Sequence, residues 1–201
     1  MTGAEVVVRP LSPTQATTRR KLIDAAVALA TEGGYEAVGM RQVAAHAGVS
    51  APTAYQYFSS KDHVLVDALV DLVGQTTADV EAKPPGRGRS AADRVAAALR
   101  RAVQRVERSP GLYVAVTRAF ISGTPEVAHV RGTLEASMRR WIELALEGSE
   151  IENEAGVTEV LEAVLFANMV GLVTGATAPA DVGDALERAV RTLLPERGRR
   201  R

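Results

Sequence analysis

Apolar residues recur along this chain at intervals of three and four positions, which is the spacing of one face of an α-helix. One such stripe lies near the start of the chain and comprises Leu22, Ile23, Ala26, Leu29 and Ala30. A longer one comprises Val64, Leu65, Ala68, Leu69, Leu72 and Val73. The sequence contains no sustained alternation of apolar and polar residues bounded by hairpin turns. The pattern therefore predicts an all-α protein.

About nine helices are predicted once Gly, Pro and Ser are used to place their ends. Three short helices come first, at residues 14–32, 40–47 and 51–58, and six follow at 61–82, 91–108, 110–122, 124–147, 154–176 and 181–194. The segment Lys83–Ser90 is too rich in Pro and Gly to be helical and is expected to be a loop. Residues 1–13 and the basic tail from Pro195 are expected to be flexible.

The second and third helices are joined by a tight turn at Gly48, Val49 and Ser50. Glycine permits the turn, Ser50 can cap the next helix, and Pro52 is tolerated in a first helical turn. Two short helices joined in this way, with the first helix supporting them, are typical of a helix-turn-helix DNA-binding domain. We assign this domain to residues 14–60 and expect a helical bundle over residues 61–196.

The helix that follows the turn carries short or hydrogen-bonding side chains, which suit phosphate oxygens and base edges. The candidate DNA contacts here are Ser50, Ala51, Pro52, Thr53, Tyr55, Gln56 and Tyr57. Lys61 follows at the start of the next helix, where a cation and a helix N-terminus together favour a phosphate. Packing at the edge of the core is the alternative role for the two tyrosines, and Phe58 is expected to be buried.

Residues 18–63 contain these features in an ordered series of short motifs. The series consists of Gly34–Ala37 (GYEA), Val43–Ala44 (VA), Ala47–Ser50 (AGVS), Thr53, Tyr55, Tyr57–Phe58 (YF) and Lys61. It resembles the DNA-binding domain of the TetR family of bacterial transcriptional regulators. The resemblance implies a homodimeric repressor that binds a double-stranded DNA operator and is released by a small effector bound in the C-terminal domain. It also places Arg19, Arg20 and Arg41 at phosphate-facing positions, for which an ordinary solvated surface is the alternative.

Three positions depart from the family pattern. Gly39 stands where Thr is usual, Pro52–Tyr55 where Gly-Thr-Leu-Tyr is common, and Gln56 where Arg or His is common. Glutamine suits adenine better than guanine, so the operator sequence stays open. A narrower resemblance is to the actinobacterial repressors of cholesterol catabolism, whose effectors are sterol-derived acyl-CoA thioesters. It is carried by Arg20–Met40, residues 57–61, residues 108–110 and residues 117–120.

The longer helices supply candidates for an effector pocket. Their apolar faces contain a few polar groups, as expected for a site that binds a hydrophobic ligand. The candidate lining residues are Tyr113, Val116, Thr117, Phe120, Met138, Trp141, Ile142, Phe166, Asn168 and Met169. Ordinary core packing is the alternative for each of them. Asn168 lies in an apolar run and therefore needs a hydrogen bond from ligand, backbone or a second subunit.

Small residues recur every four positions in the penultimate helix, at Ala163, Ala167, Gly171 and Gly175. Such a stripe lets another helix approach closely. Together with Leu186 and Val190 of the last helix, it is expected to form the dimer interface, with internal packing as the alternative. The family resemblance likewise implies a four-helix bundle made from the last two helices of each subunit.

Composition narrows the remaining classes of function. The chain of 201 residues has no cysteine, so disulfides and thiol nucleophiles are excluded, and its three histidines are isolated, so neither a metal site nor a cofactor is predicted. Lys plus Arg and Asp plus Glu both number 24, which excludes a uniformly basic surface. No catalytic motif is found, and the protein is not expected to be an enzyme. A helical protein-interaction module without specific DNA binding is the alternative function.

One apolar run bears on localisation. Residues 163–178 contain no charge, but 16 residues are fewer than the roughly 18–20 that a helix needs to cross a bilayer. We therefore predict a buried helix and no membrane association. The first ten residues lack a basic start followed by a long apolar run, so no secretory signal is expected and the protein is predicted to be cytoplasmic.

Overall fold

The computed structural model describes residues 11–84, 90–148, 151 and 153–195, with the side chains of residues 125–127 and 129 left aside. Over these residues the chain forms nine α-helices and no strand, which confirms the predicted all-α fold. The helices are α1 (Pro13–Ala37), α2 (Met40–Ala47), α3 (Ala51–Tyr57), α4 (Lys61–Ala82), α5 (Ala91–Arg108), α6 (Pro110–Ile121), α7 (Pro125–Leu146), α8 (Glu154–Thr174) and α9 (Asp181–Leu193).

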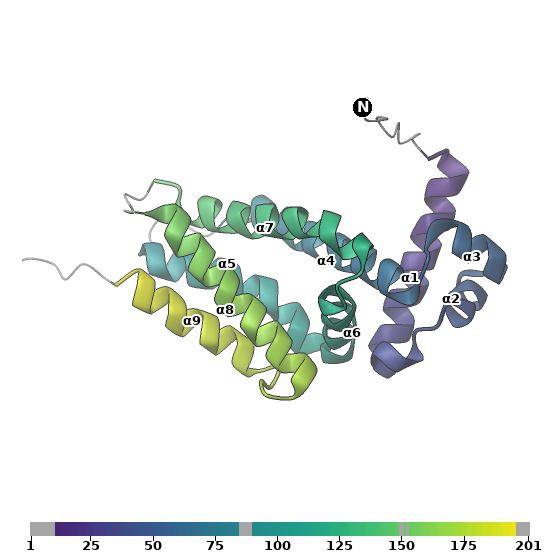
Figure 1. Cartoon of the computed structure of the whole chain (residues 1–201). Helices are drawn as coiled ribbons and strands as arrows, with labels where there is room; N and C mark the ends of the chain where they lie inside the picture. Colours follow the sequence, from purple (N-terminus) through teal and green to yellow (C-terminus); the bar gives the residue numbers. More distant parts are fainter. Residues whose placement is uncertain (1–10, 85–89, 149–150, 152, 196–201) are drawn as a thin grey trace, which may run out of the picture.

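The first three helices form a small unit at one end of the molecule, and α5 and α7–α9 form a bundle at the other (Figure 1). Helix α4 runs from the small unit into the bundle, where it packs against α6 and α7. Helix α6 lies at the junction and makes its most extensive contact with α1. Helix α3 lies at the end of the molecule that is remote from the bundle (Figure 1).

Serine side chains define several helix starts. Each accepts a hydrogen bond from the backbone N–H three residues later, which satisfies a donor that the helix leaves unpaired. These pairs are Ser12–Gln15, Ser50–Thr53, Ser60–His63 and Ser90–Asp93. Because the caps are local, the predicted starts of α3, α4 and α5 coincide with the observed ones, and Ser60 rather than Ser59 caps α4.

The largest boundary difference is at the end of α1. The sequence predicts that Gly33 and Gly34 end this helix, but a further helical turn follows and reaches Ala37. The two glycines interrupt the helix instead, with Gly33 at φ −134° and Gly34 at φ 66°. This interruption redirects the chain so that Tyr35 and Glu36 lie against α4 and α6. Most of the head (1–13), the loop (83–90) and the tail from Pro195 lies outside the described residues, but Ser12 caps α1 and Pro13 begins it, so the predicted flexible head extends too far.

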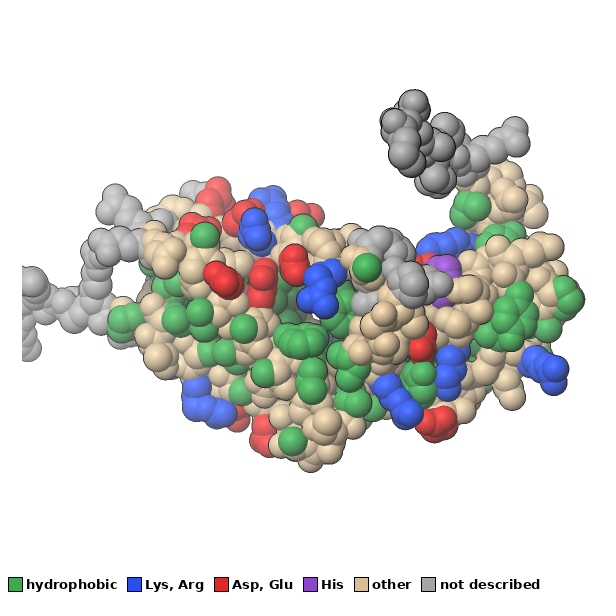
Figure 2. Space-filling view, in the orientation of Figure 1, with side chains coloured by type: hydrophobic (Ala, Val, Ile, Leu, Met, Phe, Trp, Pro, Cys, Tyr) green, Lys and Arg blue, Asp and Glu red, His purple; other side chains and the backbone are tan. Residues whose placement is uncertain are grey.

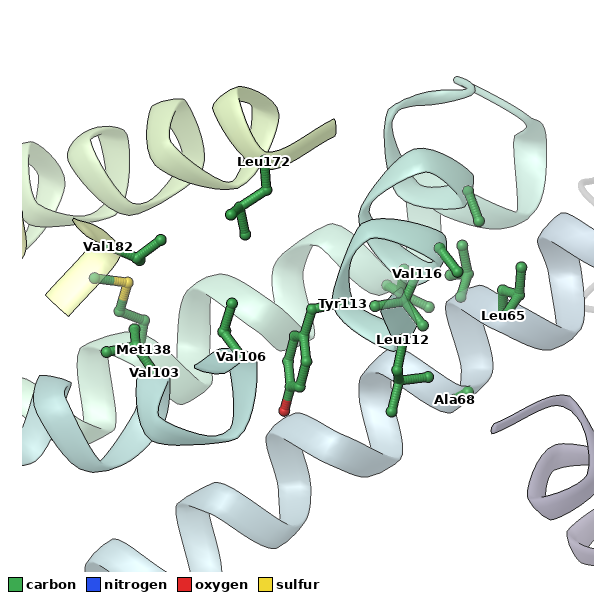
Figure 3. Packing of buried hydrophobic residues seen from close by; sticks show 14 of the residues in the cluster. Leu65, Ala68, Val103, Val106, Leu112, Tyr113, Val116, Met138, Leu172 and Val182 are labelled. Atoms are coloured by element: carbon green, nitrogen blue, oxygen red, sulfur yellow. The ribbon is translucent and has the colours of Figure 1, made fainter. Parts of the chain in front are cut away.

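One continuous core joins the two ends of the molecule. Leu22 and Ile23 of α1, Phe58 before α4 and Leu65 of α4 are all fully buried, as predicted for Phe58. Figure 3 shows Leu65 and Ala68 of α4 beside the Leu112 and Val116 side chains of α6. Because the small unit and the bundle share this core through α4 and α6, a displacement of α6 is mechanically coupled to α1.

Helix α8 is long and apolar enough to cross a membrane by length and composition, with 28% of its apolar window buried. The uncharged run has 16 residues, whereas the helix has 21, and because only Gly171 and Leu172 of that run are buried, the prediction of a buried helix is wrong for the single chain. It packs against α6, α7 and α9. A core helix passes the same length and composition test, so this single helix is weak evidence for a membrane span.

Candidate functional site

The turn between α2 and α3 has the geometry of a helix-turn-helix unit. Gly48 adopts the left-handed conformation at φ 70° and ψ 33°, and its N–H bonds to the Ala44 and Ala45 carbonyls at the end of α2. A residue with a β-carbon is strained in this conformation. Val49 is half-buried against the core and donates its N–H to the Ala44 oxygen at 3.0 Å. The angle between α2 and α3 is therefore fixed by a glycine turn and an apolar plug.

Helix α3 buries one side and presents the other to solvent. Ala54 is fully buried and fixes the inner side, whereas Pro52 and Gln56 are exposed and Tyr55 is 54% exposed. Tyr57 is half-buried and packs against the core, so the two tyrosines have different environments. The outward side thus offers an amide and a phenol for hydrogen bonding to a duplex.

The remaining candidates around α3 divide into exposed and engaged groups. Ser50 and Arg41 are exposed, and Ala51 and Thr53 are half-buried. The Ser50 and Thr53 hydroxyl oxygens lie 2.8 Å apart and share a hydrogen bond, and Ser50 also accepts the Thr53 N–H at 3.2 Å. These two hydroxyls stabilise the start of α3, whereas Arg41 extends from α2 with no ion pair among the described residues.

Arg19 and Arg20 of α1 are engaged within the protein. Arg19 donates to the Asp67 carboxylate of α4 and lies 5.6 Å from the Phe58 ring centroid. Arg20 pairs with Asp24 at 2.9 Å and with Asp71 at 2.8 Å, and the hydrogen bond to Asp24 raises the pKa of its guanidinium. These ion pairs connect α1 to α4, and because the Arg19 and Arg20 side chains stay 38% and 52% exposed, their phosphate contacts remain a prediction.

Lys61 belongs to a group of side chains at the junction of α1, α4 and α6. Its ammonium lies 3.7 Å from the Tyr35 ring centroid, and the Arg118 guanidinium lies 4.2 Å from the same centroid. The Tyr35 hydroxyl donates to Asp62 at 2.6 Å, and Arg118 pairs with Glu36 at 2.8 Å. We call these five residues the Tyr35 cluster. The Lys61 ammonium therefore contacts an aromatic face while its side chain stays 30% exposed, and its phosphate contact remains a prediction.

Helix α6 connects the Tyr35 cluster to the interior of the bundle. Arg118 is on the cluster side of α6, and Gly111 packs so closely on α1 that a β-carbon there would lie 3.3 Å from the Ala30 carbonyl oxygen. Tyr113 and Thr117, on the same helix, line an internal cavity. A ligand in that cavity therefore contacts the helix that abuts α1.

The cavity lies between α4, α5, α6, α7 and α8, is partly open to solvent and has a volume of about 370 Å³. Seven of the ten predicted lining residues lie on its wall, namely Tyr113, Thr117, Phe120, Met138, Trp141, Phe166 and Met169. The other wall residues come from α4, α5, α7 and α8, and they include Leu69, Leu72 and Val73, which the sequence predicts only as an apolar helix face. The lining is mostly hydrocarbon, so the cavity suits an apolar body.

Three predicted lining residues do not contact the cavity. Val116 and Ile142 are fully buried in the core, and Asn168 satisfies its amide within its own helix by donating to the Val164 carbonyl at 2.8 Å. Trp141 donates its indole N–H to the Thr77 hydroxyl at 2.9 Å. Tyr113 is directed from α6 towards α4, beside Val106 (Figure 3), and burial raises the pKa of its hydroxyl.

A second, polar cavity of about 600 Å³ adjoins the apolar one. The two share Leu72, Thr76 and Tyr113. Four cations line the second cavity against one carboxylate, Asp79, and they are Lys83, Arg101, Arg105 and Arg108. Arg105 pairs with Asp79 at 2.5 Å, and Arg101 donates to the Lys83 carbonyl, whereas the Lys83 and Arg108 side chains have no ion pair among the described residues.

This basic cavity is not predicted from the sequence. A signal was present, because Arg101, Arg105 and Arg108 follow one another at intervals of four and three and so share one face of α5. The segment before α5 is rich in Pro and Gly and is predicted only as a loop. That prediction does not indicate that the end of α4 lies beside this face of α5. Only the packing of α4 beside α5 and α6 converts the arginine row into a cavity wall.

The predicted dimer-interface residues divide into two groups. Ala163, Ala167 and Gly175 are exposed on or just after α8, together with Val160 at 43% and Phe166 at 45% exposure. Gly171 is buried, and a β-carbon at this position would clash with the Thr177 hydroxyl oxygen. The turn after α8 therefore requires a residue without a side chain here.

Leu186 and Val190 are also buried, because α9 packs its apolar side against α5 and α8 within the chain. They stabilise the single chain and are not available to a partner. No group of three potential metal-ligating side chains occurs in the part of the chain that the structure describes.

A helix-turn-helix unit that shares its core with a helical bundle defines a class of protein, the helix-turn-helix transcriptional regulators. The comparisons with known proteins agree. The family model for bacterial regulatory proteins of the tetR family matches residues 22–68, and that for the tetracyclin repressor-like C-terminal domain matches residues 88–193. The chain belongs to the TetR family of bacterial transcriptional regulators.

Two of its most similar curated relatives are named HTH-type transcriptional repressor KstR. The one from Rhodococcus jostii (strain RHA1) is 35% identical over 196 residues, covering 94% of this chain and 88% of the relative. The one from Mycobacterium tuberculosis (strain ATCC 25618 / H37Rv) is 32% identical over 190 residues, covering 91% and 83%. These matches confirm the narrower resemblance to actinobacterial cholesterol-catabolism repressors. The chain is thus a TetR-type transcriptional repressor, and the names of its homologues imply a non-enzymatic DNA-binding role.

Solved structures show the same fold. A TetR transcriptional regulator from Rhodococcus sp. RHA1 has a TM-score of 0.75 and 26% identity, covering 91% of this chain and 98% of its own. Thermus thermophilus FadR, solved in complex with lauroyl-CoA, has a TM-score of 0.68 and 21% identity, covering 88% and 93%. A family of soluble transcription factors implies the cytoplasm, which agrees with the predicted localisation.

Proposed function

We propose that this repressor binds a pseudo-palindromic operator as a homodimer and is released from it by an amphipathic thioester of the acyl-CoA type. Pro52, Tyr55 and Gln56 of α3 are the residues best exposed to contact base edges, and Arg41 is the best placed for a phosphate. Two copies of α3 about one helical turn, ~34–36 Å, apart would enter successive major grooves. The domain limits proposed above, residues 14–60 and 61–196, assign DNA binding and effector binding to separate parts of the chain.

The proposal for the effector depends on one observation, the meeting of the apolar and the basic cavity at Leu72, Thr76 and Tyr113. A hydrocarbon body is favoured in the first because its burial removes apolar surface from water. Phosphate groups are favoured beside the Arg101 and Arg108 guanidinium groups of the second. One molecule with an apolar body and an anionic head would occupy both. The lauroyl-CoA complex of T. thermophilus FadR, which shares the fold, is consistent with this chemistry.

The route from effector to DNA runs through α6 and α4 in this proposal. Tyr113 and Thr117 contact the cavity, while Gly111 and Arg118 on the same helix contact α1. A ligand that displaces α6 would change the position of α1 and, through α4, the separation of the two α3 helices in a dimer. The ligand needs only to bind the displaced arrangement more tightly than the DNA-bound one.

The dimer surface that we propose is the exposed side of α8. Val160, Ala163 and Ala167 follow one another there at intervals of three and four, and Ala163 also borders the apolar cavity. Apolar residues at this spacing form a stripe against which a second helix can pack. Gly171, Leu186 and Val190 are left out of this surface because they are buried within the chain.

The test combines operator selection with ligand titration. Duplexes selected from a random pool by the purified protein give the operator, and acyl-CoAs of increasing chain length are then added in a gel shift at physiological salt. We expect a long-chain acyl-CoA to release the operator, while free CoA and the free fatty acid are much weaker. Failure of every acyl-CoA to bind or to release the operator would overturn the proposed effector class.

A matched pair of variants tests the basic cavity. The double substitution Arg101→Gln and Arg108→Gln should weaken acyl-CoA binding by roughly tenfold, because two phosphate contacts are lost. Arg188→Gln, an exposed arginine of α9 outside both cavities, should leave binding unchanged. Binding of the free fatty acid should be similar in all three proteins.

A further inference from the structure

One carboxyl oxygen on the wall of the apolar cavity has no hydrogen-bond partner among the described residues. It is the Oε1 of Glu162 on α8, and it is shielded from solvent. Buried polar atoms are nearly always paired, so an unpaired one in a ligand cavity requires an explanation. A bound ligand that carries the missing partner is the direct one.

The surroundings of Glu162 restrict what that partner can be. Glu135 and Glu159 also line the cavity, and acidic side chains gather on the face where α7 and α8 meet (Figure 2). Arg131 is the single cation on the same wall. None of these residues lines the basic cavity, to which α7 and α8 contribute nothing. The anionic head of a ligand is therefore repelled from this wall and attracted to the other cavity, which leaves the hydrocarbon body next to Glu162.

We propose that Glu162 hydrogen-bonds a hydroxyl group carried by the otherwise hydrocarbon body of the effector and so selects hydroxylated ligands over plain hydrocarbon ones. The inference rests on the proposed function only in taking this cavity as the effector site. A hydroxyl both donates and accepts, so it satisfies the carboxyl group in either protonation state. Burial raises the pKa of Glu162 above its ordinary value, Arg139 lowers it, and Glu135 and Glu159 raise it further.

Trp141 provides the measurement. It is the single tryptophan of the chain and it lines the cavity, so its fluorescence reports occupancy directly. The probes are 1-decanol and its methyl ether, which differ in that only the alcohol donates a hydrogen bond. We expect the wild-type protein to bind the alcohol about tenfold more tightly than the ether, as a hydrogen bond to an otherwise unpaired buried group implies.

Three variants locate the effect. Glu162→Leu should bind both probes with equal affinity, and Glu162→Gln should keep part of the preference because an amide still forms a hydrogen bond. Glu159→Gln, which changes another acid on the same wall, should keep the preference for the alcohol over the ether even where both affinities change.

Equal affinities in the wild type, no binding of either probe, or a preference that survives in Glu162→Leu would each overturn the inference. Loss of the preference in Glu159→Gln to the same extent would also overturn it, because the acidic wall rather than Glu162 would then be responsible. The proposed function is tested separately: if no acyl-CoA binds while the alcohol preference is found, the effector class is refuted and the role of Glu162 stands.

Discussion

Tyr35→Phe is a sharp test of how the DNA-binding unit is attached to the bundle. The substitution removes the hydroxyl that donates to Asp62 at 2.6 Å and keeps the ring that contacts Lys61 and Arg118. The α1–α4 contact thus loses one hydrogen bond and little else. Because the acceptor is a carboxylate, the bond is stronger than one between neutral groups.

The magnitude follows from the environment of the bond. Hydrogen bonds to charged groups contribute roughly 1.5–3 kcal/mol, and the half-buried position of both residues places this one near the lower end, at about 1.5 kcal/mol. For a domain of this size, that loss corresponds to a decrease in Tm of roughly 3–6 °C. We also expect a weaker response of operator binding to the effector, since the Tyr35 cluster connects α6 to α1.

The hydroxyl also makes the stability difference depend on pH. Burial and the hydrogen bond to Asp62 raise the pKa of Tyr35 to about 12, above its ordinary value of 10.0. A group whose pKa is raised by folding contributes stability below its unfolded pKa and loses it as the pH rises through the folded one. The advantage of the wild type over Tyr35→Phe should therefore shrink between about pH 10 and pH 12.

Thermal unfolding followed by circular dichroism at neutral pH measures the effect. Tyr55→Phe is the matched control, because Tyr55 is 54% exposed and forms no hydrogen bond within the described structure. We expect no change in Tm for the control. A Tm for Tyr35→Phe equal to that of the wild type would refute the assigned strength of the Tyr35–Asp62 bond.

Three other outcomes test the DNA surface, the dimer surface and the cavity. Gln56→Ala should weaken operator binding by roughly 1–3 kcal/mol and relax specificity at one base pair. Arg41→Ala should weaken binding to all duplexes and lower the slope of log binding constant against log salt concentration by about one. Gel shifts over a salt series separate the two effects. Ala167→Arg should convert the dimer to a monomer in sedimentation equilibrium, while Ala136→Arg, at an exposed site on α7, should not. Glu162→Gln should stabilise the protein increasingly as the pH rises through the raised pKa of Glu162, because the wild type then buries a charge. Urea unfolding measures the difference, and equal stabilisation at pH 4 and pH 8 would contradict this prediction.

Local signals predicted much of the fold. The bounds of α2, α4 and α5 agree with the predicted ones because Ser60, Ser90 and Gly48 act within a single turn of helix. The end of α1 was predicted wrongly, because the same two glycines can end a helix or interrupt it. Which of these occurs depends on whether a later element stabilises the helical turn that follows. Here Asp62 accepts a hydrogen bond from Tyr35, and Arg118 pairs with Glu36.

The candidate site was predicted less completely. The apolar pattern identified seven residues of the cavity wall, since apolar faces of amphipathic helices must point inward. It did not separate the wall from the core, so Val116 and Ile142 were included. The unpaired carboxyl oxygen of Glu162 has no counterpart in the sequence pattern, because an acid at the edge of an apolar helix usually reaches solvent.

The sequence by itself determined which segments are helical and where the helix-turn-helix lies, because periodicity, capping and the glycine turn act between residues a few positions apart. Only the tertiary structure decided which charges are paired and which helices enclose the cavities. Arg19 pairs with Asp67, 48 positions away, and Arg118 pairs with Glu36, 82 positions away. No local pattern predicts such a partner. Packing among distant helices thus sets the ion-pair partners of the arginines on α1 and α6, and it makes a row of arginines on α5 one wall of a basic cavity.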